Sequence, residues 1–162
     1  MVEIKTKEVL TLVISILVCQ GAGIIGSLFT RPSIPIWYAT LEKPPLTPPQ
    51  WVFAPAWIML FTLMGIALFL VWRTGFTERH KRIAIGIFGT QLFLNILRSA
   101  LFFGLRSPQA GLIDIAVLLI AIVITIFLLF KISKMSSLLL LPYMLWVSFA
   151  MVLNFSILRM NP

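Results

Sequence analysis

The amino-acid sequence predicts an all-α protein, an integral membrane bundle of five transmembrane helices with a long proline-rich loop between the first helix and the second. Two observations on composition point to a membrane. Of the 162 residues, 60% are hydrophobic and 11% are charged, whereas a soluble domain has about 25% charged residues. The mean hydropathy is +1.05. A chain of this length has too little interior to hide so much apolar surface from water, so lipid must surround most of it.

A third observation, the spacing of the apolar runs, gives the number of helices. A helix needs about 20 mostly apolar residues to cross a bilayer, and in lipid it must satisfy its own backbone hydrogen bonds. The first, second and fifth runs carry no charge, Arg98 interrupts the third, and Asp114 stands near the start of the fourth. We therefore predict a single domain over residues 1–162 with five spans, at residues 9–29, 51–72, 83–105, 112–130 and 137–158.

The connection between the first two spans, residues 30–50, is long. Loops beyond about 12–15 residues are uncommon unless they are functional lids or disordered linkers. Seven of the ten prolines lie in or just after this loop, and proline lowers the entropy cost of holding an irregular path. Trp37, Tyr38 and Leu41 supply apolar side chains that a disordered linker would lack. We predict an ordered cap over one end of the helices.

Charge is distributed unequally between the two ends of the predicted bundle. The end that includes the N-terminus has eight Lys and Arg residues, and the opposite end has four. Because loops rich in Lys and Arg stay in the cytoplasm, we predict a cytoplasmic N-terminus and a C-terminus outside, for insertion into a prokaryotic plasma membrane. This explains the net charge of +8 without a nucleic-acid partner. The eight are Lys5, Lys7, Arg73, Arg79, Lys81, Arg82, Lys131 and Lys134, and the four are Arg31, Lys43, Arg106 and Arg159.

Few residues in this sequence could support conventional catalysis or bind a metal. The spans contain one acid, Asp114, and no histidine. Acid–base and nucleophilic enzymes need paired carboxylates, a nucleophile with its base, or a metal. His80 lies among cations in a connecting loop, and Cys19 is the one cysteine, so the two make a poor metal site. We expect no catalytic residue, no metal and no required cofactor.

Aromatic residues inside the spans favour a binding function instead. Trp57 lies six residues, or about 9 Å, inside the start of its span, and Trp146 is similarly set in. Tryptophans at the membrane interface anchor a helix, which explains Trp51 better than it explains these two. Large aromatic faces with few polar groups suit a flat apolar ligand such as a tetrapyrrole.

Two asparagines and two charged residues also lie within the spans. Asn95 and Asn154 either make hydrogen bonds between helices or contact a ligand, and the sequence favours neither interpretation. Arg98 and Asp114 lie toward the same, non-cytoplasmic side. Either they pair, or Arg98 meets an anionic group of a ligand such as a propionate, or Arg98 extends to the membrane surface.

Several segments together resemble the translocator protein family, whose members are also called tryptophan-rich sensory proteins or peripheral-type benzodiazepine receptors. The resemblance covers all five helices in order. The matching segments are residues 37–44 (WYATLEKP), 47–49 (TPP), 51–57 (WVFAPAW), 64–67 (MGIA), 101–108 (LFFGLRSP), 141–150 (LPYMLWVSFA) and 153–154 (LN), with Asn95 and Asp114. The chain departs from the family in having Arg98 where tryptophan is common, and in lacking the tyrosine of a C-terminal cholesterol motif.

This resemblance implies a membrane receptor for hydrophobic ligands. Porphyrins such as protoporphyrin IX or heme come first, sterols or benzodiazepine-type compounds would share the pocket, and tetrapyrrole transport or stress sensing is the implied role. It also implies a homodimer. The ligand-binding residues that it implies are Tyr38, Phe53, Trp57, Asn95, Arg98, Trp146, Phe149 and Ala150. Two alternatives stay open, a light-dependent porphyrin-degrading enzyme and a small-molecule transporter, although transport needs a more continuous polar path than this sequence offers.

Overall fold

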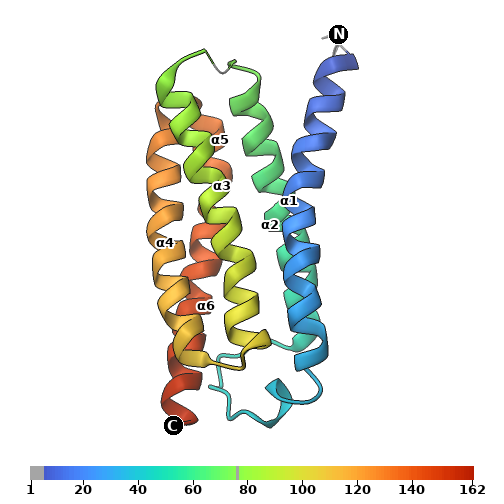
Figure 1. The fold of residues 1–162 in the computed structure, drawn as a ribbon, viewed down its shortest axis with the longest axis vertical. Helices are drawn as coiled ribbons and strands as arrows, with labels where there is room; N and C mark the ends of the chain where they lie inside the picture. The colour runs from blue at the N-terminus through green and yellow to red at the C-terminus, as the bar shows by residue number, and fades with distance from the viewer. Residues whose placement is uncertain (1–5, 76) are drawn as a thin grey trace.

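The computed structural model describes residues 6–75 and 77–162, and all the regular secondary structure within them is helical (Figure 1). The α-helices are α1 (Thr6–Ser33), α2 (Gln50–Trp72), α3 (Arg79–Ser99), α4 (Pro108–Phe130), α5 (Lys134–Leu139) and α6 (Leu141–Met160). Two short segments complete the order, a 3₁₀ turn η1 (Tyr38–Thr40) and a π-helical turn η2 (Ala100–Gly104). Lys5, one of the cations used above to orient the chain, lies outside the described residues.

Five stretches of the described residues are long and apolar enough to cross a membrane: α1, α2, α3 with η2, α4, and α5 with α6. They run alternately in opposite directions along one bundle, so α1 begins at one end and α6 ends at the other (Figure 1). The long loop, η2 and the C-terminus share an end. The prediction of an all-α bundle with five transmembrane helices is therefore confirmed.

Several helices extend beyond the predicted spans, and the extended ends of α1 and α4 have identifiable local features. α1 continues to Ser33, with Pro32 in its last turn, where the missing N–H interrupts the hydrogen-bond ladder. α4 begins at Pro108, ahead of its apolar run, because Ser107 caps it. The Ser107 hydroxyl oxygen accepts a hydrogen bond from the N–H of Ala110 at 3.2 Å, and proline is well suited to the first turn that follows such a cap.

The fifth predicted span is not one continuous helix, because it divides at Leu140 into α5 and α6. Pro142 lies two residues after this break, and since proline has no N–H it cannot bond to the carbonyl of Leu138, four residues earlier. The chain closes this turn with a hydrogen bond from the N–H of Leu140 to the carbonyl of Ser137 at 3.1 Å. The two pieces together keep the length of a membrane span.

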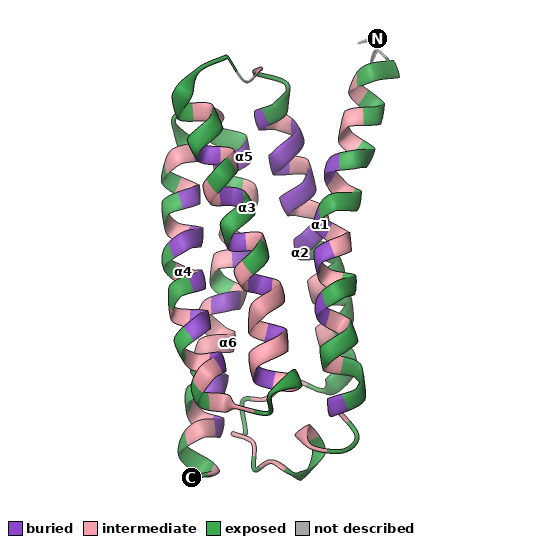
Figure 2. Ribbon diagram, viewed as in Figure 1, coloured by how far each residue is buried: buried purple, intermediate pink, exposed green. Residues whose placement is uncertain are grey.

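The helices pack in a closed order around the bundle. α1 packs on α2 and α3, α3 on α4, α4 on α5 and α6, and α2 on α5. Buried residues form inward-facing stripes, and the outward faces are exposed, as expected where lipid covers them (Figure 2). α1 and α2 approach closely because Gly65 has no side chain, since a Cβ there would lie 2.5 Å from the Cα of Ile16.

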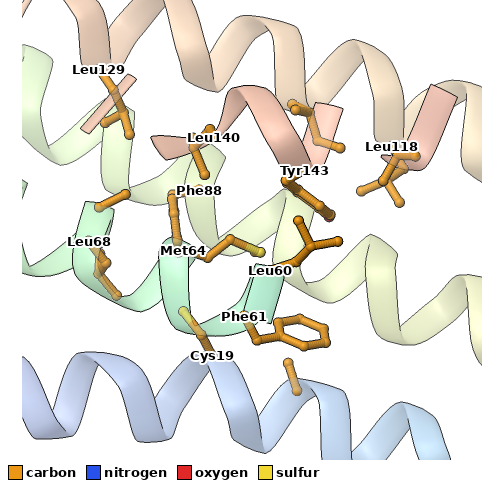
Figure 3. Close-up of a cluster of buried hydrophobic side chains, with 14 of the residues drawn as sticks. Cys19, Leu60, Phe61, Met64, Leu68, Phe88, Leu118, Leu129, Leu140 and Tyr143 are labelled. Atoms are coloured by element: carbon orange, nitrogen blue, oxygen red, sulfur yellow. The ribbon is translucent and has the colours of Figure 1, made fainter. Parts of the chain in front are cut away.

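Helix α2 supplies many of the side chains of the buried core. Figure 3 shows Leu60 and Met64 of α2 between Cys19 of α1 and Tyr143 of α6. Cys19, Met64 and Tyr143 are completely buried. Between helices in lipid this contact stabilises through close packing rather than through the exclusion of water, and it fixes Tyr143 at the centre of the bundle.

The loop between α1 and α2 is attached to η2 on one side. The Ser33 hydroxyl donates a hydrogen bond to the backbone carbonyl of Phe103. The ring of Trp37 lies 5.4 Å from that of Phe102, and the ring of Tyr38 lies 5.6 Å from that of Phe103, measured between centroids. These contacts place η1 beneath the π-helical turn.

The loop is attached to the end of α6 on its other side. The Oδ1 of Asn161 accepts a hydrogen bond from the N–H of Glu42 at 3.0 Å, and its Nδ2 donates one to the carbonyl of Glu42 at 2.9 Å. The same amide nitrogen donates to the carbonyl of Ile157. The loop therefore lies across the end of the bundle, from η2 to the C-terminal turn (Figure 1).

Candidate ligand-binding site

Six aromatic side chains from α2 and α6 meet inside the bundle, and we call them the aromatic cluster. Trp57 is at its centre, with its ring centroid 6.4 Å from that of Tyr143 and 6.5 Å from that of Trp146. The two indole planes are nearly perpendicular, at 88°. The six members are Phe53, Trp57 and Phe61 of α2, and Tyr143, Trp146 and Phe149 of α6.

Helical spacing explains why these rings share two facing surfaces. Residues three or four apart lie on the same face of a helix. The α2 members recur every fourth residue and the α6 members every third, so each helix presents one aromatic face. α2 packs closely on α5, and it meets α6 mainly through these side chains. The aromatic cluster therefore fills the space between two helices of the bundle.

One hydrogen bond joins α3 to this cluster. The Nδ2 of Asn95 donates to the hydroxyl oxygen of Tyr143 at 2.8 Å. Asn95 is 4% exposed and Tyr143 is 0% exposed, so the two polar groups satisfy each other where water is excluded. Of the two interpretations left open for Asn95, the structure shows the hydrogen bond between helices. The amide of Asn154, in the orientation that satisfies it, donates to the carbonyl of Pro108 at 2.9 Å and accepts from the N–H of Leu112 at 3.1 Å.

Arg98 reaches the cluster from the last turn of α3. Its guanidinium carbon lies 5.2 Å from the centroid of the Trp57 ring, within the range of a cation–π contact. Asp114 of α4 is buried, and its Oδ2 has no hydrogen-bond partner among the described residues. The ion pairs of the described residues involve other groups, so Arg98 and Asp114 do not form a direct pair.

The structure brings most of the residues implied by the resemblance to one place. Trp57 contacts Trp146 and Arg98, and Asn95 joins through Tyr143. Phe53 and Phe149 also belong to this group, with rings that lie 6.0 and 5.9 Å from that of Trp146. Ala150 packs against the buried core.

Tyr38 lies apart from this group. Within the described residues, its ring contacts those of Phe102 and Phe103, and the Nζ of Lys43 lies 4.7 Å above it. Burial raises the pKa of Tyr38, because the phenolate would lose its solvation, so the hydroxyl stays protonated at neutral pH. In this structure Tyr38 attaches the loop to η2 instead of facing the aromatic cluster.

Sequence reasoning missed three interior residues. Phe61 lies four residues after Trp57, and Gln91 lies four residues before Asn95, so helical spacing could have identified both. Tyr143 stands inside one of the matching segments, and a buried tyrosine requires a hydrogen-bond partner. Gln91 is 0% exposed, and neither of its amide atoms has a partner among the described residues.

A separate groove opens on the lipid-facing side of the bundle, between α4 and α6. It is almost entirely apolar, with a volume of about 470 Å³. Its lining residues are Leu112, Ile113, Ala116, Leu119, Ser148, Met151, Val152 and Phe155. Because none of these belongs to the aromatic cluster, the groove and the cluster are different surfaces of the protein.

Among the described residues, no group of three His, Cys, Asp or Glu side chains is placed to hold a metal ion.

The comparison with known proteins agrees with the resemblance that the sequence segments showed. Residues 15–160 match the model of the TspO/MBR family. The tryptophan-rich protein TspO of Archaeoglobus fulgidus is 50% identical over 154 residues, 95% of this chain and 99% of that protein. Its namesake in Chlorobaculum tepidum is 47% identical over 156 residues, 96% of this chain and 99% of that protein. The human translocator protein is 35% identical over 139 residues, 85% of this chain and 82% of that protein.

Proposed function

The chain belongs to the TspO/MBR family, and on this premise we propose that it binds flat hydrophobic ligands between its helices. Porphyrins such as protoporphyrin IX or heme are the leading class. Sterols and benzodiazepine-type compounds are further candidates for the same pocket. The bilayer supplies these ligands, because apolar ring systems partition into it from water.

The position of Trp57 carries this proposal. Its indole is half-buried and has Tyr143 and Trp146 as aromatic neighbours, so it faces the bundle interior rather than lipid tails. A flat ring held between two aromatic faces needs about 3.5–4 Å on each side. The Trp57 and Trp146 centroids are 6.5 Å apart and their planes are nearly perpendicular, so insertion of a ligand ring requires one indole to rotate and the two indoles to separate by roughly 1 Å.

The long loop is the element that would control access. It lies across the end of the bundle nearest to Trp57, which stands two turns into α2 (Figure 1). Its attachments to η2 and to Asn161 are a few hydrogen bonds and ring contacts, weak enough to open locally. In this mechanism the loop restrains entry, and the aromatic cluster holds the ring system.

A porphyrin titration of the purified protein in detergent tests this function. We expect saturable binding of protoporphyrin IX. Binding is measured from the Soret absorption of the porphyrin, because this signal does not depend on the tryptophans that are replaced. Trp57→Phe and Trp146→Phe should each weaken affinity by about 2- to 12-fold, the range for one aromatic contact. Trp51→Phe is the matched control, because Trp51 is 74% exposed. Equal affinity in all four proteins would indicate partitioning into the micelle and would refute the proposal.

The second candidate, light-dependent degradation of a bound porphyrin, is favoured by one observation. Trp57 is in contact with two further oxidisable rings, Tyr143 and Trp146. Illumination of the porphyrin complex under oxygen should then bleach the Soret band faster than in the Trp146→Phe variant. Equal bleaching rates would exclude a role of this indole in the reaction.

We also propose that the chain forms a homodimer through α3. Gly86 and Gly89 have open space where a Cβ would stand, and small residues let helices of two chains approach closely in lipid. Light scattering of the detergent complex should give the mass of two chains, and Gly89→Trp should lower it toward one. A monomeric wild-type protein would contradict the dimer.

A further inference from the structure

Arg98 has hydrogen-bonding capacity that the described residues leave unused. A guanidinium carries five N–H donors. Its Nε is buried without a hydrogen-bond partner, and Arg98 takes part in none of the ion pairs found among the described residues. Within the described part of the chain, its guanidinium lies over the ring of Trp57. A cation–π contact consumes no N–H donor, so the donors stay available to a ligand.

The location of Arg98 makes this unused capacity costly. A charged residue within a span is costly to insert into lipid, and such residues generally have a partner or a function. Extension to the membrane surface would relieve the cost. Arg98 does not take that course, because its guanidinium lies over an indole of α2 inside the bundle and the residue is half-buried.

Asp114 is the acid within the spans, and it leaves room for an additional anion. It is 5% exposed and its Oδ2 lacks a partner, but it stays beyond the 4.0 Å of a direct ion pair with Arg98. At this distance its charge offsets part of the cost of burying the guanidinium without occupying the donors. It also repels a second negative charge, so the site suits a singly charged carboxylate better than a doubly charged phosphate.

We propose that Arg98 anchors a carboxylate group of the ligand, so that the preferred ligands are flat aromatic molecules that carry a carboxylate. This inference rests on the proposed function, because Trp57 both supports the guanidinium and contacts the ligand ring. Arginine binds carboxylates through two parallel hydrogen bonds. A carboxylate on Arg98 therefore places the attached ring system against Trp57 and toward Trp146, and Arg98 determines ligand specificity.

The test compares protoporphyrin IX, which has two propionates, with its dimethyl ester, which has the same ring and no carboxylate. The wild-type protein should bind the acid about 10- to 100-fold more tightly than the ester, the range for hydrogen bonds to a charged group. Arg98→Gln should remove this preference, so that the acid and the ester bind with equal affinity. Arg106→Gln, at an exposed arginine near the same end of the bundle, is the control and should keep the preference for the acid.

The outcomes separate this inference from the proposed function. If neither porphyrin binds saturably, the proposed function fails. If the wild-type protein and Arg98→Gln each bind the acid and the ester with equal affinity, the proposed binding of the porphyrin ring is supported and the carboxylate anchor is refuted. If Arg98→Gln does not fold, the acid-to-ester ratio of the wild type decides, together with Arg98→Lys, which keeps the charge and loses the planar pair of donors. A wild-type ratio near one refutes the anchor in every case.

Discussion

Polar side chains inside the bundle have to find their partners within the protein, because lipid offers none. Asn95 and Tyr143 solve this by pairing across α3 and α6. Arg98 solves it only in part, since it contacts the Trp57 ring and leaves its donors unused. The first arrangement is explained by stability alone. The second is what we expect of a residue that acts on a ligand.

We predict that Asn95 and Tyr143 are energetically coupled. Asn95→Ala leaves the Tyr143 hydroxyl without its donor, and Tyr143→Phe leaves the amide without its acceptor. A double-mutant cycle should therefore give a coupling free energy of about 0.6–2 kcal/mol, the range for interhelical hydrogen bonds in membranes. The measurement is the free energy of unfolding of the four proteins in mixed micelles. Strict additivity of the two substitutions would show that the 2.8 Å contact contributes nothing to stability.

At the scale of elements, two departures from regular helix shape the end of the bundle that carries the loop. η2 makes a π-helical turn, in which the N–H of Leu105 donates to the carbonyl of Ala100 at 2.8 Å. This turn presents Phe102 and Phe103 to the loop, and π turns are frequent at functional sites. Pro142 explains the division of the fifth span at Leu140, which we did not predict, whereas nothing in the local sequence marks the π turn.

We predict that the packing of α1 on α2 depends on Gly65. Gly65→Ala places a methyl group 2.5 Å from the Cα of Ile16, and backbone atoms can yield only if the helices separate. The free energy of unfolding should fall by about 1–3 kcal/mol, the usual cost of overpacking.

Gly21→Ala is the matched control for this substitution. A Cβ at Gly21 meets nothing within 4 Å, so stability should stay the same or rise slightly, because alanine favours helix more than glycine does. If both variants were equally stable, the close approach of α1 and α2 at Gly65 would not be a feature of the folded protein.

At the scale of the whole molecule, the charges divide the bundle into two unlike ends. The end at which α1 begins and α2 joins α3 carries most of the cations, and the end with the loop carries few. The structure separates these ends by the length of the helices (Figure 1). By the positive-inside rule, we therefore predict that the loop and the aromatic cluster beneath it lie toward the outside.

We predict that orientation from cysteine accessibility in intact cells. Cys19 is completely buried, and Cys19→Ala removes the remaining background. In that variant, Leu46→Cys in the loop should react with a membrane-impermeant maleimide, and His80→Cys at the start of α3 should react only after the membrane is permeabilised. Both positions are exposed in the structure. The reverse labelling pattern would overturn the orientation.

The sequence by itself determined the number of helices and their approximate positions. Hydropathy depends only on the local chain and the bilayer thickness, so each span could be found without knowing its neighbours. The family could be predicted as well, because its segments lie in order along all five helices. Proline and capping residues account for the ends, as Ser107 does for the start of α4.

Only the tertiary structure decided which side chains meet. It placed Trp57 against Trp146, directed Arg98 onto Trp57 instead of to Asp114 or the membrane surface, and attached Tyr38 to η2. The spanning helices carry large apolar side chains both on their buried faces and on their exposed faces, so hydropathy does not specify how each one rotates about its axis. That rotation is set by close packing at a few small residues such as Gly65, and such packing exists only once two helices are in contact.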